Sequence, residues 1–215
     1  MSHFRAVMFD FDYTLADSSR GVVECFNYAF ERLGLPVTSE DAIKKTIGMS
    51  LKDALIHLAG REHEEKSDEF TVLYKKQADE VVADLTFIFD AVPGVVEQLR
   101  RKDICLGIVS TKFRYRIEAI LKRENILKHF DVIVGGEDVS RHKPDPEGLL
   151  AAIGKLKGRK ESTLYVGDSL IDAETAKRAG VPFAAVISGV TAREAFSDYQ
   201  VHAIIENLSE LIEIL

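Results

Sequence analysis

Short, wholly apolar runs recur along this chain of 215 residues, and each is bounded by charged or small polar residues. A strand that is buried on both faces of a parallel sheet has this signature. Segments with the 3.6-residue period of amphipathic helices lie between the runs. Alternating strands and helices predict a doubly wound α/β fold with a parallel sheet. The expected strands are 6–9, 104–109, 132–134, 163–166 and 183–187, and the expected helices are 95–101, 115–124, 147–156 and 171–179.

The interval from Asp17 to Asp90 breaks this alternation, because it contains several helical patterns and no convincing strand. We expect an inserted helical domain there, with helices over 18–33, 40–46, 51–59 and 63–85. Pro93 and Gly94 mark a natural boundary, and Gly94 is expected to open the next helix. The predicted organisation is a core of residues 1–16 and 91–215 around a helical cap of residues 17–90.

Polar residues follow the expected strands at the edge where ligands bind. In an open α/β sheet, this edge lies beyond the carboxyl ends of the strands, near the point where the strand order reverses. An Asp after one strand is more often a helix cap, but chance does not readily explain several such residues together. The candidates are Asp10, Asp12 and Thr14 after the first strand, Ser110, Thr111 and Lys112 after the second, Lys143 in a later loop, and Asp168 and Asp172 after the strand at 163–166.

The charge balance favours a small ligand. With 28 basic and 35 acidic residues, the chain has a formal net charge of −7, whereas nucleic-acid binding depends on clustered cations. Carboxylates crowded at one site repel each other unless a cation lies between them, and their hard oxygen atoms suit Mg²⁺. Bound Mg²⁺ and Lys143 would allow such an acidic protein to bind an anion.

In order and spacing, these residues resemble the four motifs of the haloacid dehalogenase-like hydrolase superfamily. The motifs are Asp10-x-Asp12-x-Thr14, Ser110, Lys143 and Gly167-Asp168-x-x-x-Asp172. The resemblance runs the full chain, and the helical insert is similar to the small C1-type cap of the phosphoglycolate phosphatase-like branch. It implies a Rossmann-like catalytic core and a Mg²⁺-dependent hydrolysis of a small phosphomonoester.

The resemblance also implies a role for each motif. Asp10 would attack phosphorus and form an acyl phosphate, which splits the hydrolysis into two displacements. Asp12 would protonate the leaving group and then activate water. Ser110 and Lys143 would hold the transferring oxygen atoms. The expected metal ligands are Asp10, Asp12 through its main-chain carbonyl, Asp168 and Asp172, the last in support of Lys143 or of the metal's waters. Substrate contacts are expected from Thr14, Thr111, Lys112, Gly48 and Met49.

Related chemistries leave alternatives open. Similar dehalogenases carry Tyr at the position of Asp12 and phosphonatases carry Ala, so both are disfavoured. Sugar phosphomutases carry a cap histidine where Val22 stands and an arginine where Leu51 stands, so they are less expected. The leading interpretation is a phosphatase similar to phosphoglycolate phosphatase. A pyrophosphatase or nucleotide phosphatase on the same scaffold is the alternative, and a non-catalytic phosphate-binding protein is a further one.

Tyr13 departs from the family pattern, which usually has Gly between the second Asp and the Thr of the first motif. A positive φ would strain a tyrosine, so we expect an extended backbone at Tyr13 with its ring toward the cap. The departure bears on fine substrate preference more than on the phosphoryl chemistry.

The two cysteines favour a reducing compartment. Cys25 and Cys105 lie far apart in apolar contexts and form no CxxC motif. No apolar stretch has the length of a membrane span or of a signal-peptide core. We expect a cytoplasmic monomer or homodimer with no nucleic-acid or membrane partner. The physiological substrate and the pathway are left open.

Overall fold

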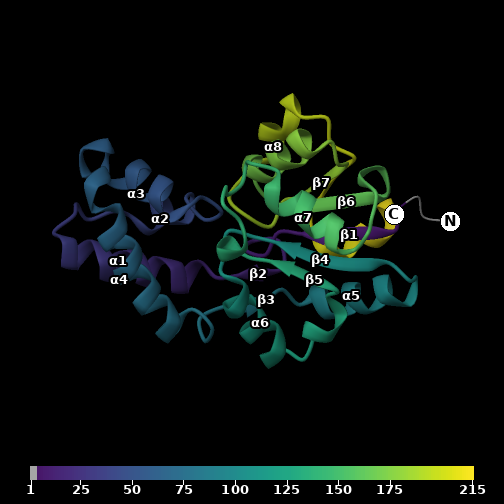
Figure 1. The fold of residues 1–215 in the computed structure, drawn as a ribbon, viewed down its shortest axis with the longest axis horizontal. Helices are drawn as coiled ribbons and strands as arrows, with labels where there is room; N and C mark the ends of the chain where they lie inside the picture. The colour runs from purple at the N-terminus through teal and green to yellow at the C-terminus, as the bar shows by residue number, and fades with distance from the viewer. Residues whose placement is uncertain (1–3) are drawn as a thin grey trace. The chain divides into compact units, whose positions relative to one another are not determined.

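The computed structural model describes residues 4–215, and the chain divides into two compact units (Figure 1). The core unit runs up to Ala16 and again from Ile88 to Leu215, and the helical unit comprises Asp17–Phe87. The chain passes between the units at β2 (Ala16–Asp17) and β3 (Phe87–Ile88), which pair as a two-stranded sheet. The sequence patterns predict no strand there, because two-residue strands carry no detectable periodicity.

The core unit is built on a six-stranded parallel sheet in the order β5-β4-β1-β6-β7-β8. The strands are β1 (Ala6–Phe9), β4 (Cys105–Val109), β5 (Val132–Val134), β6 (Thr163–Gly167), β7 (Phe183–Val186) and β8 (Ala203–Ile205). This sheet and the helical insert confirm the predicted α/β fold class. Strand β8 is missing from the sequence prediction, because its three residues lie at the sheet edge and only Ile205 is fully buried.

The helices of the core unit lie close to their predicted positions. The four predicted helices are α5 (Ala91–Arg101), α6 (Arg114–Arg123), α7 (Glu147–Lys155) and α8 (Leu170–Ala179). The sequence patterns do not predict the short α9 (Leu211–Ile214). Helix α5 begins at Ala91, so the prediction that Gly94 opens this helix is wrong. Pro93 lies in the first turn of α5, where its missing N–H group has no partner to lose.

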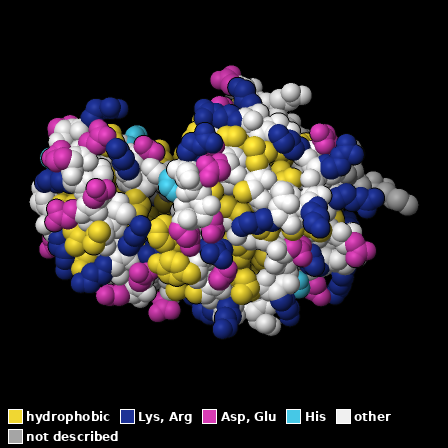
Figure 2. Space-filling view, viewed as in Figure 1, with side chains coloured by type: hydrophobic (Ala, Val, Ile, Leu, Met, Phe, Trp, Pro, Cys, Tyr) yellow, Lys and Arg dark blue, Asp and Glu magenta, His cyan; other side chains and the backbone are white. Residues whose placement is uncertain are grey.

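Basic and acidic side chains are interspersed on the face of the molecule that Figure 2 shows. Several exposed charges form ion pairs, such as Lys52 with Glu64 at 2.7 Å in the helical unit and Arg101 with Glu97 at 2.6 Å in α5. Such an arrangement is typical of a solvent-exposed surface. No helix within residues 4–215 is long and apolar enough to cross a bilayer.

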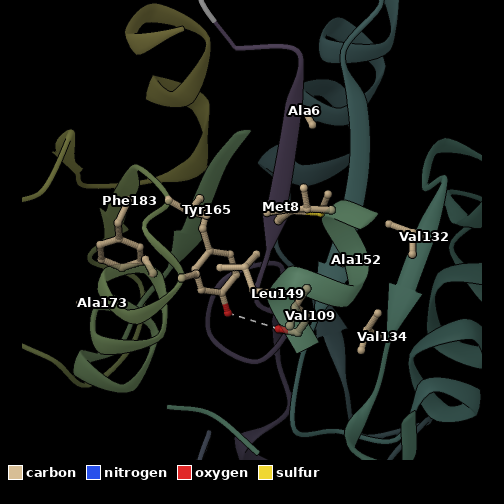
Figure 3. Close-up of a cluster of buried hydrophobic side chains, with 14 of the residues drawn as sticks. Ala6, Met8, Val109, Val132, Val134, Leu149, Ala152, Tyr165, Ala173 and Phe183 are labelled. Atoms are coloured by element: carbon tan, nitrogen blue, oxygen red, sulfur yellow. Dashed lines mark hydrogen bonds between the residues drawn. The ribbon is translucent and has the colours of Figure 1, made fainter. Parts of the chain in front are cut away.

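Helices α7 and α8 pack on one face of the sheet (Figure 3). Successive side chains of a strand point to opposite faces, so Ala6 and Met8 of β1 share the covered face with Tyr165 of β6. The helices contribute Leu149 and Ala152 of α7 and Ala173 and Ala176 of α8 to the same buried cluster. This close packing fixes the strand ends to which the polar residues are attached.

The strand order reverses at β1. From β1 the chain moves outward through β4 to β5, and it then returns to the other side of β1 as β6. Phe9, the last residue of β1, is in register with Ile108 of β4 and Val166 of β6. The carboxyl ends of these three strands therefore meet at the switch point, where α/β sheets bind ligands.

The helical unit contains α1 (Ser19–Leu33), α2 (Glu40–Lys44), α3 (Leu51–Ala59) and α4 (Ser67–Val81). Helix α4 is shorter than the predicted 63–85, because Arg61–Lys66 forms a 3₁₀ helix before it. The hydroxyls of Ser39 and Ser50 cap α2 and α3 by accepting main-chain N–H groups. An aromatic cluster forms the centre of the unit: Phe26, Phe30, Phe70 and Tyr74, with ring centroids 5.3 to 5.9 Å apart.

Candidate active site

Asp10 is the first residue after β1, and its side chain is buried. Its N–H group donates to the carbonyl of Val166 at 2.9 Å, so the parallel ladder continues by one bond past the strand. Lys143 Nζ lies 2.9 Å from Asp10 Oδ1, yet this buried oxygen accepts no hydrogen bond of good geometry. The Asp10 carboxylate is therefore held beside a cation and retains an oxygen atom available to another ligand.

Three buried carboxylates form a cluster at the switch point. One oxygen from each of Asp10, Asp168 and Asp172 lies within 4.8 Å of the others. Lys143 is the cation that pairs with Asp10 and Asp172, at 2.9 and 2.6 Å, so the three carboxylates and one ammonium leave two negative charges uncompensated. A divalent cation with a preference for oxygen ligands would neutralise them. The residues present therefore fit a metal such as Mg²⁺.

The pKa values of the cluster express the same imbalance. Burial raises the pKa of Asp10 to about 7, where Lys143 opposes the shift and the charges of Asp172 and Asp12 add to it. Burial and the charges of Asp172 and Asp10 raise the pKa of Asp168 well above its usual value. Burial alone would lower the pKa of Lys143, but the neighbouring carboxylates raise it overall. Without a further cation, the ionised carboxylates are thus disfavoured in this site.

Asp172 already has hydrogen-bond donors on both of its oxygen atoms. Oδ1 accepts Lys143 Nζ at 2.6 Å and the Tyr165 hydroxyl at 2.8 Å. Oδ2 accepts the hydroxyl of Ser169 at 2.5 Å and its N–H at 3.2 Å, as part of the capping box that begins α8. This geometry favours Asp172 as a support for Lys143 over Asp172 as a direct metal ligand.

Asp168 has fewer protein partners around its carboxylate. The hydroxyl of Thr14 donates to Oδ1 over a long 3.4 Å. Gly189, in the loop after β7, approaches the other oxygen so closely that a Cβ atom at this position would overlap Asp168. Like Asp10, Asp168 is suited to bind a metal, because its only side-chain donor within residues 4–215 is distant. The predicted substrate contact Thr14 lies against this carboxylate.

Asp12 is paired with Lys112, another predicted substrate contact. Lys112 Nζ lies 3.1 Å from Asp12 Oδ1, and both side chains are nearly buried. Ser110, Thr111 and Lys112 follow β4, and the N–H of Lys112 donates to the Ser110 hydroxyl at 3.3 Å. The Asp12 side chain is not part of the cluster of three acids. The expected contribution of Asp12 to a metal site, through its main-chain carbonyl, stays a prediction.

The loop that carries Lys143 is fixed by the start of α7. Glu147 accepts the N–H groups of Ser140 and Arg141 at 2.8 and 3.2 Å, and its pKa is lowered, chiefly by the bond from Ser140. These bonds hold the two residues that shortly precede Lys143 against the start of α7.

Tyr13 has φ of 59°, so the prediction of an extended backbone at this position is wrong. The side chain is buried, and the hydroxyl of Ser188 in the loop after β7 donates to the Tyr13 carbonyl. Surrounding structure thus holds the left-handed conformation, which costs a non-glycine residue about 1 kcal/mol. Local backbone preference therefore does not decide the conformation at Tyr13, because tertiary contacts control it.

Gly48 and Met49 belong to the helical unit, in the turn between α2 and α3. Gly48 has φ of 97°, which favours glycine. Their predicted contact with substrate stays a prediction.

Sequence reasoning assigns Tyr165 only to a strand, yet the structure brings its hydroxyl to the site. The hydroxyl contacts Asp172, Lys143 and the carbonyl of Val109. Burial and the charge of Asp172 raise its pKa well above the usual value, so the hydroxyl keeps its proton. One signal could have identified it: a tyrosine in an otherwise aliphatic buried strand requires a polar partner.

A parallel α/β sheet with buried carboxylates and a lysine at its switch point is an arrangement typical of hydrolase cores. The model of the haloacid dehalogenase-like hydrolase family matches residues 7–186, and the chain belongs to this family.

Relatives match the chain over nearly its whole length. Phosphoglycolate phosphatase from Salmonella choleraesuis is 30% identical over 237 residues, which cover 100% of this chain and 94% of that protein. The enzyme of the same name from Escherichia coli K12 is 29% identical and covers 98% of this chain and 92% of its own length. The crystal structure of a haloacid dehalogenase-like hydrolase from Bacteroides fragilis has a TM-score of 0.94 and 44% identity, covering 97% of this chain and 99% of that chain.

Proposed function

We propose that this protein is a Mg²⁺-dependent phosphatase that hydrolyses a small phosphomonoester through an aspartyl-phosphate intermediate on Asp10. The observation that carries the proposal is the buried Asp10 carboxylate, which lies 2.9 Å from Lys143 and has an oxygen atom without a good hydrogen bond. An anionic nucleophile can approach an anionic phosphate only where cations offset their repulsion. Lys143 supplies one such cation.

The residues would act in two displacements. Asp10 attacks phosphorus, and the leaving alkoxide takes a proton from Asp12, so that the phosphoryl group becomes bound to the Asp10 carboxylate. Asp12 then accepts a proton from water as the water attacks the acyl phosphate, which releases inorganic phosphate and restores Asp10. Because Asp12 is paired with Lys112 at 3.1 Å, this pair has to open for Asp12 to carry the proton. Ser110 and Lys143 hold the phosphoryl oxygen atoms in both steps.

Asp10 and Asp168 would hold the metal, together with the main-chain carbonyl of Asp12, while Asp172 supports Lys143. When bound, Mg²⁺ supplies positive charge that reduces the repulsion between carboxylate and phosphate and stabilises charge on the transferring oxygen atoms. The uncompensated charge of the acid cluster supports this assignment.

We further propose that the helical unit acts as a cap. An acyl phosphate has to be protected from water until the leaving group departs, and a closing domain can do this. The turn with Gly48 and Met49 would then select the substrate. The full-length similarity to phosphoglycolate phosphatases supports 2-phosphoglycolate as the first substrate to test.

The test is a panel of phosphorylated metabolites with and without Mg²⁺, in which released phosphate gives kcat/KM for each compound. We expect a small phosphomonoester, with 2-phosphoglycolate the leading candidate, to be hydrolysed only with the metal. A clear preference for pyrophosphate or a nucleotide would replace this substrate assignment. Phosphate binding without turnover of any compound would overturn the proposal in favour of a binding protein.

A further inference from the structure

Tyr165 places a phenolic hydroxyl inside the apolar core of the sheet, directly behind the acid cluster. The residue has 0% exposure, and its ring packs in the buried cluster that also contains Leu149, Ala173 and Phe183 (Figure 3). Phenylalanine would fill the same space without the cost of burying a hydroxyl, which is considerable when no partner is present. The partners of this hydroxyl therefore indicate what it does.

All three partners of the hydroxyl belong to the candidate site or adjoin it. The hydroxyl donates to Asp172 Oδ1 at 2.8 Å, and the carbonyl of Val109, the residue before Ser110, is a second acceptor at 3.3 Å. Its oxygen accepts a hydrogen bond from Lys143 Nζ at 3.3 Å. Three separate segments of the chain, the end of β4, the Lys143 loop and α8, thus meet at one hydroxyl.

These bonds determine how the ammonium group of Lys143 is oriented. An ammonium has three N–H donors, and Lys143 Nζ has three neighbouring acceptors: Asp172 at 2.6 Å, Asp10 at 2.9 Å and Tyr165 at 3.3 Å. The bonds to Asp172 and Tyr165 have acceptable geometry, whereas the contact with Asp10 does not. Two donors are thus anchored, which leaves the third N–H for another acceptor, while Asp10 Oδ1 lies 2.9 Å from the same nitrogen.

We propose that Tyr165 is a positioning residue for phosphoryl transfer, which fixes Lys143 and Asp172 so that one N–H of Lys143 stays directed at the phosphoryl oxygen atoms beside Asp10. The inference rests on the proposed phosphatase function. Removing the hydroxyl leaves Lys143 free to rotate toward Asp172, and an ammonium that is displaced from the reacting oxygen stabilises the transition state less.

The test compares Tyr165→Phe with a matched control, Tyr74→Phe, which removes one hydroxyl from a buried tyrosine of the helical unit. With p-nitrophenyl phosphate and Mg²⁺, we expect Tyr165→Phe to lower kcat by about tenfold, the usual effect of losing a hydrogen bond to a charged group. The KM and the Mg²⁺ concentration for half activation should change less than about threefold, because the hydroxyl contacts neither Asp10 nor Asp168. The control should keep its kcat.

A double-mutant cycle with Asp172→Asn distinguishes positioning from a general structural role. If Tyr165 acts through Asp172 and Lys143, its loss should cost less than about threefold in kcat once Asp172 has been changed. If the two changes lowered kcat by independent factors that multiply in the double variant, the inference would be overturned. A Tyr165→Phe protein with wild-type kcat would also overturn it. Failure of Tyr165→Phe to fold would assign the hydroxyl to stability and would also overturn it. A wild-type protein without any phosphatase activity would instead overturn the proposed function itself.

Discussion

The two units of this protein bury different kinds of residue. Every charged residue that is buried as a whole within residues 4–215 belongs to the core unit: Asp10, Asp12, Arg116, Lys143, Asp168 and Asp172. The nearly buried side chain of Lys112 also belongs to the core unit. The buried polar residues of the helical unit carry only hydroxyls, and those of Thr46, Ser67 and Thr86 donate to carbonyls three or four residues earlier. The helical unit is organised for packing, whereas the core unit bears the cost of buried charge at one edge of its sheet.

The difference in buried charge indicates that the reactive groups lie in the core unit. Buried charges are costly unless they are paired, and those of the acid cluster are only partly paired by Lys143. A fold retains such an arrangement where a ligand completes it. Variants in the two units should therefore separate loss of activity from loss of stability.

The largest expected effect is on activity, from Asp10→Asn in the core unit. Loss of the nucleophile should lower Mg²⁺-dependent turnover of an aryl phosphate by a factor on the order of 10⁴. Stability should not fall, because the change removes one of three crowded carboxylates. Phosphate release and urea unfolding measure the two quantities. Ordinary turnover by Asp10→Asn would exclude the aspartyl-phosphate mechanism.

The next effect is on stability, from Phe70→Ala in the helical unit. Phe70 has 0% exposure and lies between Phe26, Phe30 and Tyr74, so the cavity should cost about 3–5 kcal/mol of unfolding free energy. Urea unfolding followed by circular dichroism measures this cost. The control is Val72→Ala on the same helix, where Val72 is 66% exposed and the change should be near zero. Equal effects of the two changes would show that the aromatic cluster does not hold the unit together.

A third effect concerns pH and metal. Burial raises the pKa of Asp10 to about 7 in the folded protein, from an ordinary value of 3.8, so without a bound metal the folded state binds the proton more tightly than the unfolded state. Stability should therefore fall as pH rises through the window from about 4 to 7, by about 3–4 kcal/mol. Thermal unfolding at a series of pH values measures the slope. Asp10→Asn should reduce the slope, and Mg²⁺ should raise Tm most at neutral pH. A stability that rises through this window would contradict the assigned charge imbalance.

The smallest effect is expected at an exposed ion pair. Lys52 and Glu64 of the helical unit lie 2.7 Å apart with about half of each side chain exposed, and the hydrogen bond and charge of Lys52 lower the pKa of Glu64. Glu64→Gln should change Tm slightly and only at low salt, because ions screen exposed charges.

The comparison is with the buried pair of Lys112 and Asp12. Lys112→Met removes one member of this pair, so it should lower Tm more and depend less on salt. Scanning calorimetry at two salt concentrations compares them, and equal salt dependence would remove the distinction between buried and exposed pairs.

Local sequence determined much of this protein by itself. The apolar runs and their periodic connections determined the parallel sheet, because burial on both faces requires uninterrupted apolar residues. The acids and the lysine at the strand ends were recognisable for a related reason, since chain topology brings the ends of β1, β4 and β6 together whatever the details of packing. Strand β8 and the start of α5 at Ala91 lay beyond this reasoning, because short or irregular elements depend on their neighbours.

Only the tertiary structure decided the finer arrangement of the site. The Ser188 hydroxyl bonds to the carbonyl of Tyr13 in its left-handed conformation, and Lys112 pairs with Asp12 from another strand. Tyr165 is part of the site because its hydroxyl bonds to Lys143 and to the carbonyl of Val109, which are both far away in sequence. Sequence patterns express which surfaces are buried, but the orientation of a buried polar group depends on the positions of all its partners, and these exist only in the folded chain.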